Sequence, residues 1–271
     1  MAKAVDWNHE LIGRYWEYWS KRQDRHSEYF SNRYGDAIVR FMQDVLPLRK
    51  RRVLDFGCGP GFLIPHLLAS AAGVSGCDTS QEAVALVSKK FAGQQNWEGA
   101  ALIENGRAPF DDGVFDVATC VETVEHVLDE DLPALFGELR RLVSPDGVIF
   151  ITTPHLEHIR FNTMYCAVCD HEFHWRQHVR SWTADDLRQR VETAGFEVPF
   201  CRGISFKMWK TQHRASVKDL SLRIAWDRMQ FATARLLDRV SPQPFPNGRE
   251  VGLKLKMGYE MHLVAVARPV K

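Results

Sequence analysis

Short runs of β-forming residues alternate with stretches of helical periodicity from about residue 50 onward. The runs read RRVLDFG, GVSGCD, GAALIE, VFDVATC and GVIFITT, and the segments between them repeat apolar residues at the helical period. This alternation is typical of βαβ units, so it predicts an α/β fold in which helices cover both faces of a Rossmann-like, mostly parallel sheet. Two later runs, FEVPFC and YEMHLVAVARP, extend the sheet, and the apolar character of the second predicts a last strand inserted between neighbours.

Segments outside this alternating pattern divide the chain further. An aromatic and basic stretch and then YGDAIVRFMQDVL predict helices ahead of the first strand. In the aromatic stretch, Trp16, Tyr18 and Trp19 could cover a ligand or pack the helix on the sheet, because aromatic residues at helical spacing usually face a core. The predicted parts are an N-terminal helical cap (1–48), a core (49–202 and 257–271), a His- and Cys-rich substrate loop (154–182) and a helical insertion (203–256).

The insertion contains one long amphipathic pattern, at about residues 215–240. Its apolar stripe consists of Leu222, Trp226, Met229, Ala232, Leu236 and Val240, with several arginines off the stripe. Docking of this helix on the domain is the simplest interpretation. Peripheral contact with a membrane surface and capping of the substrate are the alternatives.

Composition excludes some classes of protein. A chain of 271 residues with 45% hydrophobic content can form one elaborated domain. Its 35 basic and 34 acidic side chains nearly cancel, which disfavours a nucleic-acid partner without excluding one. No run of about 18 apolar residues predicts a membrane span, and MAKAVDWNHE lacks the apolar region of a secretion signal, so we expect a cytoplasmic protein. The six cysteines are scattered, which argues against a secreted disulfide framework.

The segment VLDFGCGPG ends an apolar strand at Asp55 and continues into a turn with Gly57, Gly59 and Gly61. Glycines let the backbone approach a ligand closely, so this turn predicts a nucleotide-like ligand. A dinucleotide-binding turn would have its third glycine where Phe62 stands. A carboxylate at Asp55 suits a cofactor with a positively charged amino acid end, which S-adenosylmethionine carries.

The ends of the next two strands offer further cofactor-binding candidates. GVSGCD ends in Asp78, whose carboxylate could accept hydrogen bonds from ribose hydroxyls or cap the following helix. Glu104 and Asn105 follow the third strand, where they could form hydrogen bonds with the edge of an adenine ring. Polar residues in loops, however, usually only stabilise turns.

The motifs VLDFGCGPG, CD, APFDDGVFDVATCVETVEHV, LVSPDGVIFITTP and ETAGFEV, over about residues 50–200, resemble those of class I S-adenosylmethionine-dependent methyltransferases. The resemblance implies a seven-stranded sheet with a reversed last strand. It also implies a glycine turn around the methionine end, Asp78 on the ribose and the Glu104–Asn105 loop beside adenine. We also predict Cys120, at the end of the fourth strand, as a cofactor-binding residue.

Acidic residues and a histidine follow the fourth strand in CVETVEHV. On a helix start, Glu122, Glu125 and His126 would share one face, and a cation or proton would relieve their repulsion. This ExxEH, with His178 further on, resembles the metal-binding quartet of small-RNA 2′-O-methyltransferases, and ubiquinone-pathway O-methyltransferases have a similar ExxEH. The resemblance implies a divalent metal, Mg²⁺ or Zn²⁺, on Glu122, Glu125, His126 and His178. A metal-free general base at His126 or His178, or a purely structural polar cluster, stays open.

A zinc site competes for part of the same segment. Cys166, Cys169, His174 and His178 have C-x2-C-x4-H-x3-H spacing, and His171 could replace His178. The alternative is that two free thiols pack a substrate loop. The segment also resembles bacterial methyltransferases encoded with cell-surface glycan pathways.

These features together predict methyl transfer from S-adenosylmethionine to a hydroxyl oxygen of a small molecule or glycan, with metal assistance as an option. A quinone-precursor phenol and the terminal ribose of an RNA are alternative acceptors, and N-methylation needs no metal. Two other classes of protein, an NAD-dependent dehydrogenase and a non-catalytic zinc module, would each account for only one of these sequence features.

Overall fold

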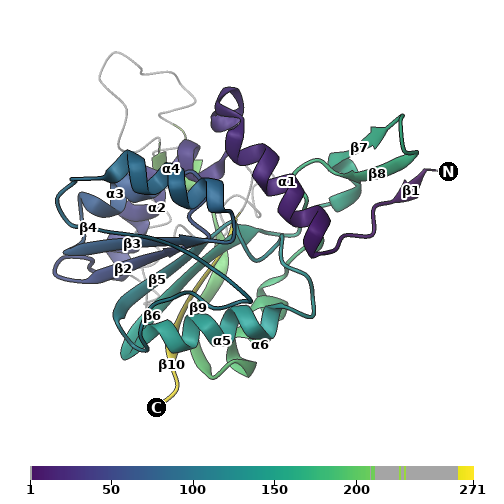
Figure 1. Ribbon diagram of the computed structural model, residues 1–271. Helices are drawn as coiled ribbons and strands as arrows, with labels where there is room; N and C mark the ends of the chain where they lie inside the picture. Colours follow the sequence, from purple (N-terminus) through teal and green to yellow (C-terminus); the bar gives the residue numbers. More distant parts are fainter. Residues whose placement is uncertain (1, 208, 211–225, 227–228, 230–261) are drawn as a thin grey trace.

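The computed structural model of the protein describes residues 2–207, 209–210, 226, 229 and 262–271, and it contains the expected sheet (Figure 1). Its seven strands lie in the order β4-β3-β2-β5-β6-β10-β9. In chain order they are β2 (Arg52–Phe56), β3 (Gly73–Asp78), β4 (Trp97–Leu102), β5 (Phe115–Val121), β6 (Val143–Pro154), β9 (Phe196–Ile204) and β10 (His262–Pro269). The last strand, β10, runs antiparallel to both neighbours, β6 and β9. The prediction of a mostly parallel sheet with one reversed, inserted strand is therefore confirmed.

Helices cover both faces of the sheet because its strands present apolar side chains to both sides (Figure 1). Val53 on β2 packs with α2 (Phe30–Val45), α3 (Ile64–Leu68) and α4 (Gln81–Phe91), whereas the next residue, Leu54, packs with α5 (Leu132–Leu142) and α6 (Ala184–Thr193). Such alternation over most strands produces two apolar cores with the sheet between them.

The N-terminal cap is helical but interrupted. Helix α1 (His9–Lys21) begins at Asn8, whose side chain accepts a hydrogen bond from the Leu11 N–H. A 3-10 helix, η1 (Gln23–Glu28), and then α2 follow. The aromatic stretch is therefore two short helices, and the break lies at Arg22, which leaves helical dihedral angles and pairs with Asp24.

The predicted substrate loop 154–182 contains regular structure of its own. After η2 (Ile159–Asn162), strands β7 (Thr163–Cys166) and β8 (His171–His174) form an antiparallel hairpin. The N-terminal strand β1 (Lys3–Ala4) adds to β8 and completes a second sheet of order β1-β8-β7, which Figure 1 shows apart from the main sheet. Sequence reasoning missed this sheet because its strands are short and its third strand comes from the distant N-terminus.

Except for Trp226 and Met229, the helix predicted at 215–240, with its suggested membrane contact, lies outside the described residues, as does most of the insertion 203–256. In the part of the chain that is described, no helix is long and apolar enough to cross a membrane.

Candidate functional site

A cavity of about 700 Å³ opens at the carboxyl ends of the central strands, between them and the N-terminal helices. Its lining includes Gly57 and Gly59 of the turn after β2. Both glycines have positive φ, 74° and 48°. A Cβ on Gly57 would stand 2.7 Å from Thr123 Oγ1, so position 57 has no room for a side chain.

Asp78, at the end of β3, lines the same cavity. Its Oδ2 accepts a hydrogen bond from the Gly59 N–H at 2.8 Å, and its Oδ1 accepts one from the Ser80 N–H at 2.8 Å. Burial raises the pKa of Asp78, and the backbone hydrogen bonds partly oppose that rise. Because a carboxylate accepts more than two hydrogen bonds, the side chain can hold the glycine turn and still accept from a ligand hydroxyl.

The other predicted cofactor-binding residues divide into two groups. Asn105 lines the cavity, whereas Asp55, Gly61, Glu104 and Cys120 are absent from its lining. Asp55 is buried behind the turn, where its Oδ1 accepts a hydrogen bond from Thr119 Oγ1 at 2.9 Å. Burial raises the pKa of Asp55 to about 7. Gly61 packs against the side chains of α4, Cys120 is fully buried in the sheet, and Glu104 pairs its backbone with Arg107.

Tyr29, which sequence reasoning missed, lines the cavity opposite the glycine turn. An added Cβ on Gly59 would lie 3.8 Å from its ring. The Tyr29 hydroxyl is buried without a hydrogen-bond partner, and burial raises its pKa. No sequence signal places a residue that precedes the glycine turn by a whole helix against that turn.

The segment after β5 that carries the predicted metal ligands is a turn, not the start of a helix, and the helix expectation is wrong. Glu122 has a positive φ of 50°, which non-glycine residues rarely adopt and which directs the chain away from a helical path. The next helix, α5, begins only at Leu132. Even so, Glu122, Glu125 and His126 all line the cavity, as does His178 from the distant loop.

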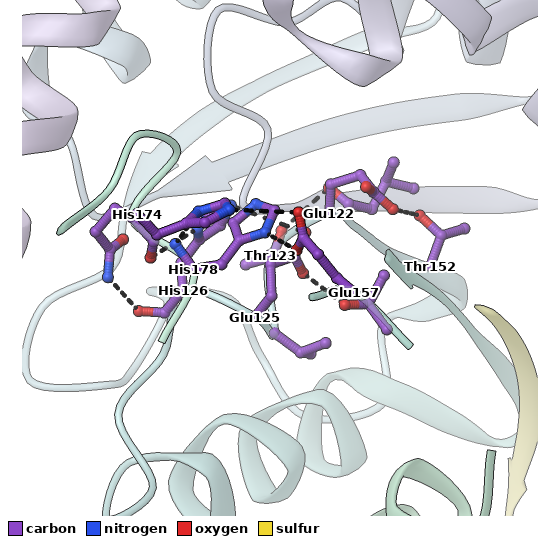
Figure 2. Close-up of polar contacts among 12 residues, drawn as sticks. Glu122, Thr123, Glu125, His126, Thr152, Glu157, His174 and His178 are labelled. Atoms are coloured by element: carbon purple, nitrogen blue, oxygen red, sulfur yellow. Dashed lines mark hydrogen bonds and ion pairs between the residues drawn. The ribbon is translucent and has the colours of Figure 1, made fainter. Parts of the chain in front are cut away.

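Three of these four side chains converge, as Figure 2 shows. Ligand atoms of Glu125, His126 and His178 all lie within 4.8 Å of one another. Glu125 Oε1 lies 3.9 Å from His126 Nε2, and the rings of His126 and His178 have centroids 4.9 Å apart. Glu125 is 1% exposed.

Burial and mutual repulsion perturb the protonation of this cluster. Burial, together with the charge of Glu122, raises the pKa of Glu125 well above its usual value. Burial and the neighbouring His178 lower the pKa of His126 well below its usual value, and burial lowers that of His178. A buried carboxylic acid beside neutral imidazoles is the protonation state expected of ligands before a cation replaces the proton.

Glu122 is not part of the convergent group. Its Oε1 accepts a hydrogen bond from Thr152 Oγ1 at 2.8 Å, and its Oε2 lies 3.3 Å from His262 Nε2 on β10. The pair with His262 joins the turn after β5 to the last strand, β10, and no local sequence pattern predicts this contact.

A second cluster lies behind His178 and contains a residue that sequence reasoning did not select. Glu157, His174 and His178 bring ligand atoms within 4.8 Å of one another. Glu157 contacts His178 Nδ1 through Oε2 and lies 3.3 Å from His174 Nε2 through Oε1 (Figure 2). Although burial opposes it, the hydrogen bonds from the two imidazoles lower the pKa of Glu157.

The alternative zinc set is not brought together. His174 and His178 are buried beside Glu157, whereas Cys166 and Cys169 lie at the turn of the β7–β8 hairpin, Cys169 exposed. Within the described part of the chain, neither cluster with metal-ligand spacing contains a cysteine. His171 Nδ1 donates a hydrogen bond to the Cys169 carbonyl oxygen at 2.6 Å.

An aromatic wall lines the cavity on the side of His126. Tyr15, Trp16 and Trp19 from α1 and Trp175 from the loop all line it. The Trp16 ring meets the His126 ring edge-on at 4.6 Å, and Trp16 Nε1 donates to Gln177 Oε1 at 2.8 Å. Of the two interpretations of the aromatic helix, the placement of Trp16 and Trp19 on a cavity favours the ligand-covering one, whereas Tyr18 is 56% exposed.

A glycine turn after the first strand and an acidic residue at the end of the second, on a sheet of this order, define an α/β enzyme that binds an adenosine-type cofactor at its switch point. Residues 18–199 match the family described as "Methyltransferase domain". The chain belongs to this family and is a class I S-adenosylmethionine-dependent methyltransferase. Family membership favours methyl transfer over the dehydrogenase and zinc-module alternatives.

Curated relatives and solved structures agree with this assignment. The chain is 31% identical over 150 residues to a ubiquinone biosynthesis O-methyltransferase of Thiobacillus denitrificans, covering 53% of this chain and 59% of the relative. It is 29% identical over 152 residues to that of Ralstonia nicotianae, covering 54% and 58%. The chain thus spans less than two thirds of the length of these relatives.

Two solved structures share the fold. A complex of the Haloferax volcanii Trm112 methyltransferase activator and a methyltransferase matches with a TM-score of 0.62 at 14% identity, covering 94% of this chain and 98% of that one. The structure of a DhpI–SAH complex matches with a TM-score of 0.57 at 16% identity, covering 97% and 99%. At these identities the likeness concerns the fold alone.

Proposed function

We propose that this methyltransferase acts on a hydroxyl oxygen of a small organic molecule, with a divalent cation held by Glu125, His126 and His178. The observation that carries the proposal is the convergence of buried Glu125 and His178 with half-buried His126 at the wall of the cavity that Gly57 and Asp78 also line. The names of the curated relatives, ubiquinone biosynthesis O-methyltransferases, support an oxygen acceptor.

The residues fit a cation because Glu125 and His126 each keep one ligand atom available. Thr153 Oγ1 donates to Glu125 Oε2 at 3.0 Å, while Glu125 Oε1 is buried without a hydrogen-bond partner. The His126 Nδ1 lies 3.4 Å from the Gln177 carbonyl oxygen, which only accepts, so Nε2 retains its lone pair. Two imidazoles and one carboxylate suit a divalent transition metal or Mg²⁺ with waters completing its shell.

The chemistry divides between the cofactor and the protein. The sulfonium of S-adenosylmethionine makes its methyl group electrophilic, so the protein must align the acceptor oxygen, exclude water and remove the hydroxyl proton. A bound divalent cation lowers the pKa of an acceptor hydroxyl. Without a cation, His126 and His178 are the groups placed to receive the proton. A bound cation would occupy the same lone pairs, and the acidified hydroxyl would release its proton to water.

The cavity wall limits the acceptor. Tyr15, Trp16, Trp19 and Trp175 present flat apolar surfaces, which suit an aromatic or otherwise apolar molecule better than a polyphosphate chain. Near-neutral net charge also disfavours RNA, because binding of its backbone needs a basic surface. A phenol or a lipid-like alcohol therefore fits this wall better than a strongly hydrated glycan does.

A methyl-transfer assay tests the proposal. Labelled S-adenosylmethionine is incubated with pools of phenols, apolar alcohols, glycans and RNA, with Mg²⁺ or Mn²⁺ and with excess EDTA. We expect transfer to the phenol or alcohol pool, its loss on chelation, and its loss in Glu125→Gln.

The matched control is Glu130→Gln, which makes the same chemical change at an exposed position five residues further along the chain. It should retain wild-type transfer. Full activity in EDTA, or equal activity of the two variants, would contradict the role of the cation. Labelling of the glycan or RNA pool alone would contradict the acceptor class.

A further inference from the structure

We infer that Glu157 is a positioning residue that sets the tautomer of His178, and that His174 in turn holds Glu157. The inference rests on the proposed function in that it explains how His178 is prepared as a ligand or base. Glu157 and His174 do not line the cavity, and their hydrogen bonds and close contacts with the site are made to His178.

The first step is the protonation of His174. The backbone N–H of His178 donates a hydrogen bond to His174 Nδ1 at 3.2 Å. A ring nitrogen that accepts a hydrogen bond carries no proton, so the proton of neutral His174 is on Nε2. That nitrogen lies 3.3 Å from Glu157 Oε1, a close polar contact whose geometry is not that of a hydrogen bond.

The second step is the orientation of Glu157. Its Oε1 also accepts a hydrogen bond from Asn162 Nδ2 at 3.0 Å. Because Oε1 contacts both Asn162 and His174, the other oxygen, Oε2, faces His178 Nδ1 and forms a hydrogen bond with it. The stacking of the two imidazole rings, with centroids 4.4 Å apart, keeps both on the same carboxylate.

The third step concerns His178 itself. An ionised carboxylate only accepts hydrogen bonds, so the contact with Glu157 places the His178 proton on Nδ1. The lone pair is then on Nε2, the nitrogen left for the group formed with Glu125 and His126. Carboxylates behind metal-binding or catalytic histidines orient the ring and raise its basicity in this way.

The alternative role for Glu157 is purely structural, with its contacts to Asn162 and His174 holding the loop together. That role would affect stability but would leave the tautomer of His178 and the affinity for a cation unchanged. These two properties therefore discriminate between the roles.

The experiment reads the ring nitrogens of His178 by long-range ¹H–¹⁵N NMR at pH 8, without metal, and Mn²⁺ affinity by calorimetry. Mn²⁺ is chosen because thiolates such as those of Cys166 and Cys169 bind it poorly. We expect wild-type His178 to carry its proton on Nδ1, and Glu157→Ala to shift the population toward Nε2–H. Mn²⁺ affinity should fall by about 10–100-fold in Glu157→Ala, and the affinity for S-adenosylmethionine should not change.

Glu172→Ala is the matched control, because Glu172 is an exposed glutamate on the neighbouring strand β8. It should match wild type in both readouts. Glu157→Asp, which keeps a carboxylate, should give a tautomer population and a Mn²⁺ affinity between those of wild type and Glu157→Ala. If Glu157→Ala does not fold, Glu157→Gln replaces it, since an amide cannot accept hydrogen bonds from both imidazoles through separate oxygens.

Wild-type His178 with its proton on Nε2, or an unchanged tautomer in the Glu157 variants, would overturn the inference. Failure of the proposed function is a separate outcome. If wild-type protein binds no Mn²⁺, the cation proposal fails, while the NMR readout still decides whether Glu157 sets the tautomer.

Discussion

The Asp78 carboxylate accepts a hydrogen bond from the backbone N–H of Gly59, with 2.8 Å between the nitrogen and Oδ2. This bond ties the end of β3 to the glycine turn that follows β2, and both residues line the cavity. The two strands pair in parallel, which brings their carboxyl ends to the same edge of the sheet.

Substitution Asp78→Ala should weaken S-adenosylmethionine binding by about 10–100-fold, because charge-assisted hydrogen bonds contribute roughly 1.5–3 kcal/mol. Calorimetric titration measures the affinity. Asp111→Ala, at an exposed position, is the control and should bind as wild type does. Equal affinities in the two variants would remove Asp78 from the cofactor site.

Substitution Gly57→Ala should abolish cofactor binding, whereas Gly93→Ala should not. The two glycines have nearly the same φ, 74° and 77°, so both alanines carry similar backbone strain of about 1–2 kcal/mol. Only the Gly57 methyl group meets a neighbour, Thr123, while nothing lies within 4 Å at Gly93. Thermal melting measures how far the backbone strain lowers the stability of each variant, and calorimetry measures its affinity for the cofactor. Cofactor binding by Gly57→Ala at wild-type affinity would show that the turn tolerates a side chain.

Substitution Trp16→Ala should raise the KM for the acceptor by about tenfold and leave S-adenosylmethionine affinity within twofold, because the ring forms part of the acceptor wall. Tyr18→Ala, on the same helix but exposed, is the control. Steady-state kinetics on the acceptor found in the labelling screen provides the measurement. A Trp16→Ala enzyme with an unchanged KM would place the acceptor elsewhere.

Substitution Glu122→Gln should retain Mn²⁺ binding, whereas Glu125→Gln should lose it. An amide at position 122 can still accept from Thr152, whereas Glu125 supplies a buried ligand oxygen without a partner. Calorimetry with Mn²⁺ on the two variants compares them directly. Loss of binding in Glu122→Gln would restore this residue as the fourth ligand that the ExxEH resemblance implied.

Asp55 should make the cofactor-free protein less stable as the pH rises from about 4 to 7. Burial raises the pKa of its carboxyl to about 7, so the folded state binds a proton that the unfolded state has already lost above its ordinary pKa of 3.8. Stability therefore falls with rising pH through this window and levels off above it. Asp55→Asn should flatten the difference in the free energy of unfolding between pH 5 and pH 8, measured with urea. An unchanged difference would mean that Asp55 is ionised in the folded state.

The glycine turn and Asp78 could be predicted because both belong to local patterns that follow a strand. In the same way, the alternation of apolar runs was sufficient to predict the layers of the fold. The aromatic helix was predicted as an element, but its function was not, because a helical stripe of Trp and Tyr is the same whether it meets a core or a ligand.

The ExxEH segment illustrates the limit of reasoning from spacing. A helical spacing would have put Glu122 with Glu125 and His126, but the positive φ of Glu122 turns it toward Thr152 and His262. His174 was assigned to the cysteines by its spacing, yet it lies against Glu157.

The sequence by itself determined the α/β fold, the cofactor end of the site and the residue types available for chemistry, because each depends on contacts between neighbours along the chain. Only the tertiary structure decided which histidines and carboxylates meet. Glu125 comes from the turn after β5, whereas Glu157 and His178 come from the loop after β6. The edge at which they converge exists only once β5 and β6 have paired and that loop has folded back over them. Hydrogen bonds such as that between Glu157 and His178 join residues whose separation along the chain bears no fixed relation to their distance in space, so no periodicity could have indicated them.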